Sequence, residues 1–227
     1  MIIDCHTHIG RNHHVDQSVS KLLADMDDAL IDRSLVFACD FNDCPNEYLL
    51  SEILTHRDRL RPVLAYHPST DLANLKAMLA SEDAAAVKVY LGYDHWYPSD
   101  ENIYNLADYT SHNGIPLIFH CGDCLSSVRS AKLKYAHPLG IDDLAVDFPD
   151  QKIVIAHMGF PWVRDTAEVV YKNANVYTDV SGFVYGSFSA KDGDKFAKVL
   201  EEYLDIAGDD DKMLFGSDTP ISSPKSI

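Results

Sequence analysis

The stretch IIDCHTH (residues 2–8) opens the chain with an apolar run that ends in two histidines, two residues apart. The run Met1–Cys5 predicts a β-strand, and alternation along an extended chain places Asp4, His6 and His8 on the same side. Two imidazoles on a rigid strand form a ready pair of metal ligands. The same side chains could equally bond backbone groups or solvent, so this stretch alone leaves both interpretations open.

Short apolar, β-branched runs of this kind recur at roughly 30 residues, about the length of one strand-plus-helix unit. We expect eight strands, at Met1–Cys5, Ser34–Cys39, Leu60–Ala65, Ala85–Leu91, Ile115–Phe119, Lys152–Ala156, Asn175–Thr178 and Lys212–Phe215. Amphipathic helical patterns lie between them, at Ser18–Leu30, Asn46–Arg57, Asp71–Ala80, Glu101–His112, Gly140–Asp147, Trp162–Lys172 and Lys191–Asp205. This alternation predicts one α/β domain over residues 1–227, a (β/α)8 TIM barrel, with a doubly wound open sheet as the alternative.

One feature departs from a complete barrel. After the eighth predicted strand only Thr219–Ile227 remain, too few residues for a closing C-terminal helix. Without that helix, the outer apolar face of the last and first strands would be bare. We expect either that the chain is truncated or that a partner subunit, as in a homodimer, covers the seam.

Composition excludes several classes of protein. Hydrophobic residues make up 46% of the chain, enough for a sizeable core, and the formal net charge is −16. That charge repels phosphate backbones, so we expect no nucleic-acid partner. The apolar runs are too short to cross a bilayer, and no secretory signal is visible. Five cysteines, an odd count, favour reduced thiols and a cytoplasmic location.

Ligand-type residues also follow other predicted strands. His120 ends the fifth strand, His157 follows the sixth, and Asp218 follows the eighth. Barrel geometry brings these carboxyl ends around a common axis, where such enzymes place their chemistry. Together with His6 and His8, five ligand-type residues at four strand ends predict one shared metal site.

These runs resemble the amidohydrolase superfamily, and most closely its amidohydrolase-related branch, which includes aminocarboxymuconate semialdehyde decarboxylase. The resemblance rests on IDCHTHIG, LLADMDDALID, AHMGFPWVRD, NVYTDVSG and LFGSDTP, spread over almost the whole chain. It implies a metal-dependent barrel enzyme in which His6, His8, His120 and Asp218 bind the metal. His157 would be a further ligand or the acid–base residue. Members of the family mostly continue past the GSD-containing strand into a final helix, which this chain lacks.

Lys88 has two interpretations. In binuclear amidohydrolases a lysine at the end of the fourth strand is carboxylated and bridges two metals. A lysine inside the barrel could instead pair with a carboxylate such as Asp4 or Asp218, because a buried ammonium needs a partner. The one-metal branch resembles this sequence more closely, so we expect a structural or substrate-facing Lys88.

The expected reaction is hydrolysis of a small polar substrate. A divalent cation, zinc before Mn, Fe or Co, lowers the pKa of bound water toward neutrality. His157 would shuttle the proton, and Asp218 would bind metal or accept a proton. A non-oxidative decarboxylase on the same scaffold is one alternative, and an inactive metal-binding barrel is another.

Charged and aromatic loop residues could shape the substrate pocket. Arg11 and Arg164 are the candidates for binding a substrate carboxylate, because related decarboxylases place an arginine near Arg164, sometimes across a dimer interface. His67-Pro68 resembles a run in TatD-type nucleases, which however carry a metal-binding Glu where this chain has Lys88. The Cys121–Cys124 pair has C-x-x-C spacing, for which we expect a structural role rather than redox chemistry.

Overall fold

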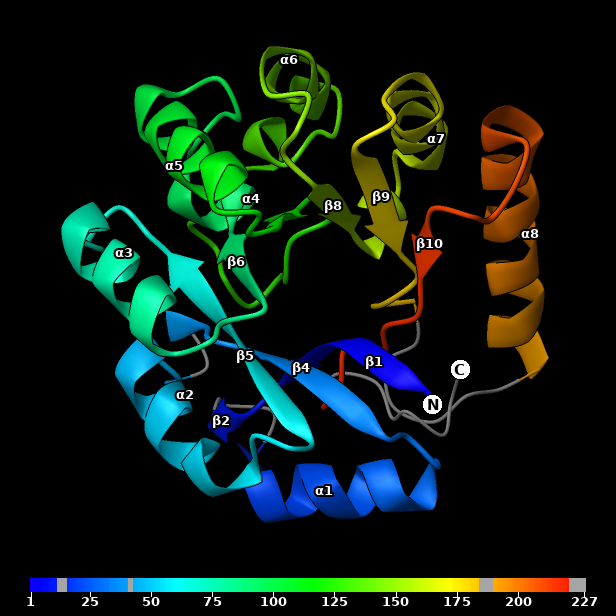
Figure 1. Cartoon of the computed structure of the whole chain (residues 1–227). Helices are drawn as coiled ribbons and strands as arrows, with labels where there is room; N and C mark the ends of the chain where they lie inside the picture. Colours follow the sequence, from blue (N-terminus) through cyan, green and yellow to red (C-terminus); the bar gives the residue numbers. More distant parts are fainter. Residues whose placement is uncertain (12–15, 41–42, 184–189, 221–227) are drawn as a thin grey trace.

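A computed structural model describes residues 1–11, 16–40, 43–183 and 190–220, without the side chains of Arg11, Asp16 and Ala190. Eight parallel strands pair in the order β1-β4-β5-β6-β7-β8-β9-β10 (Figure 1). They are β1 (Ile3–His8), β4 (Arg33–Phe37), β5 (Leu60–Tyr66), β6 (Ala86–Val89), β7 (Leu117–His120), β8 (Ile153–Ala156), β9 (Val176–Asp179) and β10 (Met213–Leu214). Each overlaps one of the eight predicted runs.

The ring of strands closes between β1 and the residues that follow β10. Backbone N–H groups of Cys5 and His8 donate to the carbonyls of Phe215 and Thr219, at 2.9 and 2.7 Å. Between them, Asp218 donates its N–H to the carbonyl of His6 at 2.8 Å. A closed ring has no open edge, so the TIM barrel is confirmed and the open sheet was the wrong alternative.

Helices surround this ring (Figure 1). The seven predicted ones are present as α1 (Val19–Asp28), α2 (Asn46–Glu52), α3 (Leu72–Ser81), α5 (Glu101–His112), α6 (Gly140–Asp147), α7 (Val163–Lys172) and α8 (Ala190–Ala207). Side-chain caps begin two of them: Ser18 accepts from the N–H of Lys21, and Asp71 accepts from that of Ala73.

The sequence did not predict several short elements. They are helix α4 (Leu91–Asp94), the hairpin β2 (Gly10–Arg11) with β3 (Asp16–Gln17), and the 3-10 turns η3 (Leu133–Tyr135) and η4 (His157–Gly159). The predicted helix Asn46–Arg57 ends earlier than expected, at Glu52, and the 3-10 turn η2 (Leu54–His56) follows it. Elements of two to four residues carry no readable periodicity, because hydrophobic patterns need several turns or alternations to stand out.

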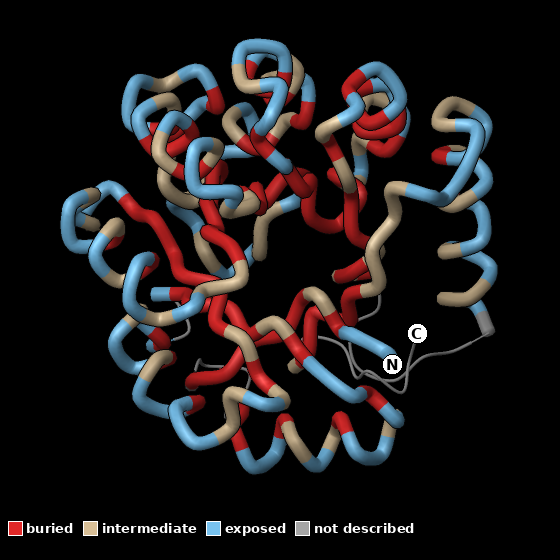
Figure 2. Tube along the Cα trace, viewed as in Figure 1, coloured by how far each residue is buried: buried red, intermediate tan, exposed pale blue. Residues whose placement is uncertain are grey.

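Buried residues gather on the strands and on parts of the surrounding helices, whereas much of the outer helical surface is exposed (Figure 2). Inside the ring, packed residues come from neighbouring strands: Phe37, Val63, Ala86, Ile118, Val154 and Ala156. A larger cluster lies between the strands and helices α3, α5, α6, α7 and α8. This packing makes a rigid frame, so the side chains at the strand ends are held in place.

No secondary-structure element follows β10 among the residues that the structure describes. The prediction about a closing helix concerns the last residues, and 221–227 lie outside the described part of the chain. None of the helices in the described ranges is long and apolar enough to span a membrane.

Candidate metal centre

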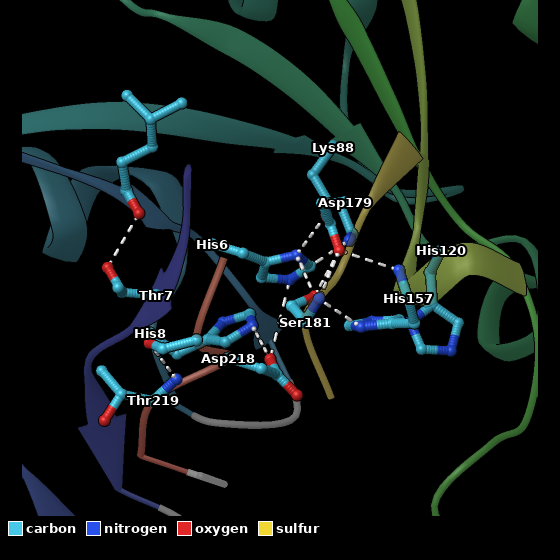
Figure 3. A network of polar contacts seen from close by, with 12 residues as sticks. His6, Thr7, His8, Lys88, His120, His157, Asp179, Ser181, Asp218 and Thr219 are labelled. Atoms are coloured by element: carbon cyan, nitrogen blue, oxygen red, sulfur yellow. Dashed lines mark hydrogen bonds and ion pairs between the residues drawn. The ribbon is translucent and has the colours of Figure 1, made fainter. Parts of the chain in front are cut away.

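Three of the predicted ligands meet at the carboxyl end of the barrel (Figure 3). His6 and His8 come from β1, and Asp218 comes from the segment after β10. All three side chains are buried. Oδ1 of Asp218 lies 3.6 Å from Nε2 of His6 and 3.4 Å from Nε2 of His8. Strand β1 and the segment after β10, which are far apart in sequence, therefore supply one compact donor set.

These separations fit a metal ion. With ligand atoms about 2.1 Å from a tetrahedral ion, two ligand atoms lie about 3.4 Å apart. The ligand atoms of His6, His8 and Asp218 all lie within 4.8 Å of one another. Three protein ligands with one position left open are typical of catalytic zinc sites. The donor set thus has the composition and the spacing of a catalytic metal centre.

Asp218 is held as an anion. Burial alone would raise the pKa of its carboxyl group, but a hydrogen bond with His8 and the nearby imidazoles of His157 and His6 hold that pKa well below its usual range. Its backbone is left-handed, with φ of 59°. Strained backbone conformations of this kind cluster at functional sites.

His157 also has a left-handed backbone, with φ of 61°, at the start of η4. Its ring centroid lies 4.7 Å from that of His6 and 4.9 Å from that of His120. Gly182 makes this placement possible, because a Cβ there would come within 2.7 Å of Nδ1 of His157. His157 also forms a second group of potential ligand atoms, with His6 and Asp179, that lie within 4.8 Å of one another, so its role as a further ligand or as the acid–base residue stays a prediction.

His120 ends β7, and its Nε2 lies 2.9 Å from the carbonyl oxygen of Asp123. Burial, then the neighbouring His157 and Lys88, hold the pKa of His120 well below its ordinary value, so the ring is neutral. Its ring packs edge-on against that of His157. Among the described residues, however, His120 belongs to no group of three potential metal ligands whose atoms lie within 4.8 Å of one another. Its assignment as a metal ligand stays a prediction.

Asp179 and Ser181 belong to the site, although sequence reasoning did not single them out. Asp179 ends β9, and its Oδ2 lies 2.9 Å from Nδ1 of His6. Its Oδ1 accepts from the backbone N–H of His157 at 2.9 Å and from the hydroxyl of Ser181. The available signal was position: Asp179 follows an apolar strand, as His120 and His157 do.

Lys88 lies inside the barrel, with Nζ 3.5 Å from Nε2 of His6 (Figure 3). Burial lowers the pKa of its ammonium to about 8, against the opposing attraction of Asp179 and Asp218. Asp179, which the sequence analysis did not suggest, has the larger of these two opposing effects and Asp218 the smaller, and a pairing of Lys88 with Asp4 or Asp218 stays a prediction. A structural or substrate-facing role for Lys88 stays a prediction.

Asp4 is also buried in this region. Its carboxylate accepts from the backbone N–H groups of His6 at 3.1 Å and Ser217 at 3.0 Å. Burial raises the pKa of Asp4 to about 6, although these hydrogen bonds oppose the change. Asp4 thus braces the two backbone segments that carry the donor set.

The remaining predicted residues lie at the rim or outside the described part. Arg164 is exposed in the first turn of α7. The side chain of Arg11 lies outside the described atoms, so the roles of both arginines stay predictions. Cys121 and Cys124 are free thiols, and burial raises their pKa values to about 12 and about 11. Such thiols form little thiolate, as the structural interpretation requires.

Solved structures share this architecture. A probable 2-pyrone-4,6-dicarboxylic acid hydrolase from Acinetobacter baumannii is 16% identical, with a TM-score of 0.72 over 100% of this chain and 86% of that one. A zinc-bound amidohydrolase from Burkholderia multivorans is 15% identical, with a TM-score of 0.69 over 97% of this chain and 85% of that one. The 5-carboxyvanillate decarboxylase from Sphingomonas paucimobilis is 12% identical, with a TM-score of 0.65 over 98% of this chain and 89% of that one. Likeness at these identities establishes a common fold.

The family itself is established by sequence. No curated protein matches the chain. The model of the Amidohydro_2 family, described as amidohydrolase, matches residues 3–227. This match includes every strand end described above, and the chain therefore belongs to the amidohydrolase family.

Proposed function

We propose that this protein is a metal-dependent hydrolase that activates water against a small polar substrate, one that carries a carboxylate. The observation that carries the proposal is the spacing of His6, His8 and Asp218, at 3.4 and 3.6 Å between the imidazole nitrogens and the carboxylate oxygen. Membership of the amidohydrolase family supports an enzyme.

The buried charges also favour a divalent cation. Among the described residues, the buried carboxylates are those of Asp4, Asp179 and Asp218, and the buried ammonium is that of Lys88. When all are ionised, the site carries an excess of two negative charges. Uncompensated buried charge is costly, and a divalent cation would cancel this excess.

A divalent cation here supplies Lewis acidity, which polarises a carbonyl group and strengthens water as a nucleophile. Zinc is our first choice, supported by the zinc-bound neighbour from Burkholderia multivorans. Imidazole and carboxylate ligands also suit Mn, Fe and Co.

The protein's own residues divide the remaining work. His6, His8 and Asp218 would hold the cation. His157 binds Ser181 through Nδ1, at 2.8 Å from the hydroxyl oxygen, which leaves Nε2 to move a proton. Asp218, anionic and at the edge of the donor set, is the second group that can accept a proton from water.

A carboxylated substrate is supported by two neighbours, whose names specify a dicarboxylic acid hydrolase and a carboxyvanillate decarboxylase. Lys88 provides an ammonium beside the donor set. Arg164 and Arg11 would add positive charge at the rim, where a planar guanidinium can bind a carboxylate with two hydrogen bonds.

Decarboxylation on the same scaffold is the second candidate. It is favoured by the carboxyvanillate decarboxylase neighbour and by the Lys88 ammonium, which could pair with the carboxylate that is lost. Turnover in ¹⁸O-labelled water separates the two reactions, because hydrolysis incorporates the label into product and decarboxylation releases carbon dioxide.

Metal content and turnover test the proposal together. We expect the purified protein to bind one equivalent of zinc and to hydrolyse at least one member of a panel of esters, lactones and amides that carry carboxylates. His6→Gln should lose zinc and activity. His112→Gln, the same change in an exposed helix, should retain both. A wild-type protein that binds no divalent metal contradicts the proposal.

We also propose a cytoplasmic location and a small-molecule substrate without a nucleic-acid or membrane partner. All five cysteines lie in the described ranges and are free thiols, which suits a reducing compartment.

A further inference from the structure

We infer that Asp179 and Ser181 are positioning residues that fix the proton of His6 and the proton of His157 on Nδ1, so that both rings present an unprotonated Nε2 to the site. The inference rests on the proposed function only for the identity of the metal ion that these nitrogens would bind.

Asp179 can only accept hydrogen bonds. It is buried, and its Oδ1 faces two backbone N–H groups, of His157 at 2.9 Å and of Ser181 at 3.1 Å. A backbone N–H has no acceptor capacity, so Oδ1 must be the acceptor in both contacts.

The tautomer of His6 follows from its neighbours. Nδ1 lies 2.9 Å from Oδ2 of Asp179, which is a carboxylate oxygen, so Nδ1 must carry the proton. Nε2 lies 3.5 Å from Nζ of Lys88, whose ammonium can only donate, and 3.6 Å from Oδ1 of Asp218, which can only accept. The contact of Nδ1 with Asp179 is much the shorter and therefore assigns the tautomer, and the Lys88 contact agrees with it.

Ser181 transmits this constraint to His157. Its hydroxyl has one proton, which it donates to Oδ1 of Asp179 in the short contact between them. The hydroxyl oxygen then has only lone pairs for Nδ1 of His157, 2.8 Å away, and for Nδ1 of His6, 3.1 Å away. Neutral His157 must therefore donate from Nδ1, and its Nε2 is left as an acceptor.

The reverse assignment is unfavourable. If Ser181 donated to His157, its oxygen and Oδ1 of Asp179 would face each other at close range with lone pairs only. The network has one self-consistent set of protons, and it runs from one carboxylate to both imidazoles (Figure 3). Outer partners of this kind orient metal-binding histidines and set which nitrogen is available.

Asp179→Asn tests the inference. The amide oxygen can still accept from the two backbone N–H groups, which places the NH₂ group against Nδ1 of His6. An NH₂ group only donates, so the proton of His6 must move to Nε2. We expect zinc affinity to fall about 10–100-fold, as when outer partners of metal ligands are lost.

Asp4→Asn is the matched control. It makes the same buried carboxylate-to-amide change and removes the same charge, but the hydrogen bonds of Asp4 described above go to backbone N–H groups of His6 and Ser217. If only charge matters, the two variants will lose zinc affinity equally. A loss at least about tenfold larger in Asp179→Asn is expected if the tautomer matters.

The direct readout is ¹⁵N NMR of histidine-labelled, metal-free protein, with the His6 and His157 signals assigned through His6→Gln and His157→Gln. In the wild type both rings should show a protonated Nδ1 and an unprotonated Nε2. Asp179→Asn should invert His6. Ser181→Ala should release His157 into a mixture, whereas His6 should keep its proton on Nδ1, because the contact with Asp179 remains when the 3.1 Å contact with the hydroxyl is lost.

The outcomes separate this inference from the proposed function. A wild-type His6 protonated on Nε2 overturns the inference even if the protein binds zinc. A wild-type Nδ1–H tautomer in a protein that binds no metal supports the inference and contradicts the metal-dependent function. If Asp179→Asn does not fold, the wild-type and Ser181→Ala spectra still decide.

Discussion

Two buried histidines, His6 and His67, have the same hydrogen bond and opposite charge tendencies. Each places Nδ1 2.9 Å from Oδ2 of an aspartate, Asp179 for His6 and Asp94 for His67. Yet the pKa of His6 falls to about 3, chiefly through burial and then Lys88. The pKa of His67 rises, because Asp94 and Asp40 outweigh the effect of burial.

The two rings differ first in burial and then in the neighbours of the other ring nitrogen. Nε2 of His6 lies 3.5 Å from the ammonium of Lys88 and 3.6 Å from Oδ1 of Asp218, whereas Nε2 of His67 lies 3.9 Å from the carboxylate of Asp40. A cation beside a ring opposes its protonation, and an anion favours it. Burial and Lys88 thus favour a neutral His6, the form that a metal ligand requires, whereas two carboxylates favour a charged His67.

The largest expected effect separates the two pairs by metal binding. His6→Gln should weaken zinc binding by more than about 100-fold, because it removes a ligand rather than an outer partner. His67→Gln should leave zinc affinity unchanged. Competition with a chromophoric chelator measures both, and equal losses in the two variants would contradict the assignment of His6.

Lys88→Met removes the cation that distinguishes His6 from His67. In metal-free protein we expect unfolding free energy to fall by about 3–5 kcal/mol, because buried carboxylates lose their partner. Saturating zinc should restore most of this loss. Urea denaturation with chelator and with zinc provides the measurement.

The control for Lys88→Met is Lys172→Met, which breaks the exposed ion pair with Asp142. There we expect the free energy of unfolding to fall by at most about 1 kcal/mol, and we expect zinc to leave this loss unchanged. Zinc content should stay at one equivalent in both variants. Two equivalents in the wild type, lost on substitution of Lys88, would instead indicate a carboxylated bridging lysine.

Asp94→Asn tests the raised pKa of His67 through pH. Because the folded pKa of His67 exceeds its unfolded value of about 6.5, the pair stabilises the protein fully below that pH and loses this contribution as pH rises through the folded pKa. The wild type should exceed the variant in unfolding free energy by about 1.5–3 kcal/mol near pH 6, and by less near pH 9.

Urea denaturation at both pH values measures this difference. The exposed pair of His112 and Asp108 offers a control, since Asp108→Asn should change stability little at either pH. An equal gap between wild type and Asp94→Asn at the two pH values would mean that His67 is neutral in the folded protein.

Asp40→Asn should have the smallest effect. Asp40 is half-exposed, and its oxygen lies 3.9 Å from Nε2 of His67. We expect a loss of about 0.5 kcal/mol near pH 6, which high salt abolishes because water and ions screen exposed pairs. A loss as large as that of Asp94→Asn would show that Asp40, rather than Asp94, sets the charge of His67.

Much of the site was predictable because barrel geometry is regular. Alternation on β1 predicted that His6 and His8 share a side, and the strand-end rule brought His157 and Asp218 to the same region. The same rule also placed Asp179 at a strand end, but it did not show which groups donate hydrogen bonds to this carboxylate. Those donors belong to His6, His157 and Ser181, which lie in three different segments of the chain.

Other features depended on the orientation of individual side chains. His120 lies where a ligand was expected, yet its Nε2 faces the carbonyl of Asp123. Lys88 was placed inside the barrel correctly, but its strongest charge partner, Asp179, lies on a strand 91 positions later in the chain. Position along a strand does not specify which atom of a side chain meets which neighbour.

The sequence by itself determined the eight-strand barrel and which strand ends carry imidazoles and carboxylates, because apolar periodicity and alternation are local properties of the chain. Only the tertiary structure decided which of those groups form the donor set and where their protons sit. Those properties depend on contacts of 2.9–3.6 Å between β1, β6, β9 and the segment after β10. Protonation and charge in a buried site follow from such contacts, and the side chains acquire them only when the ring closes.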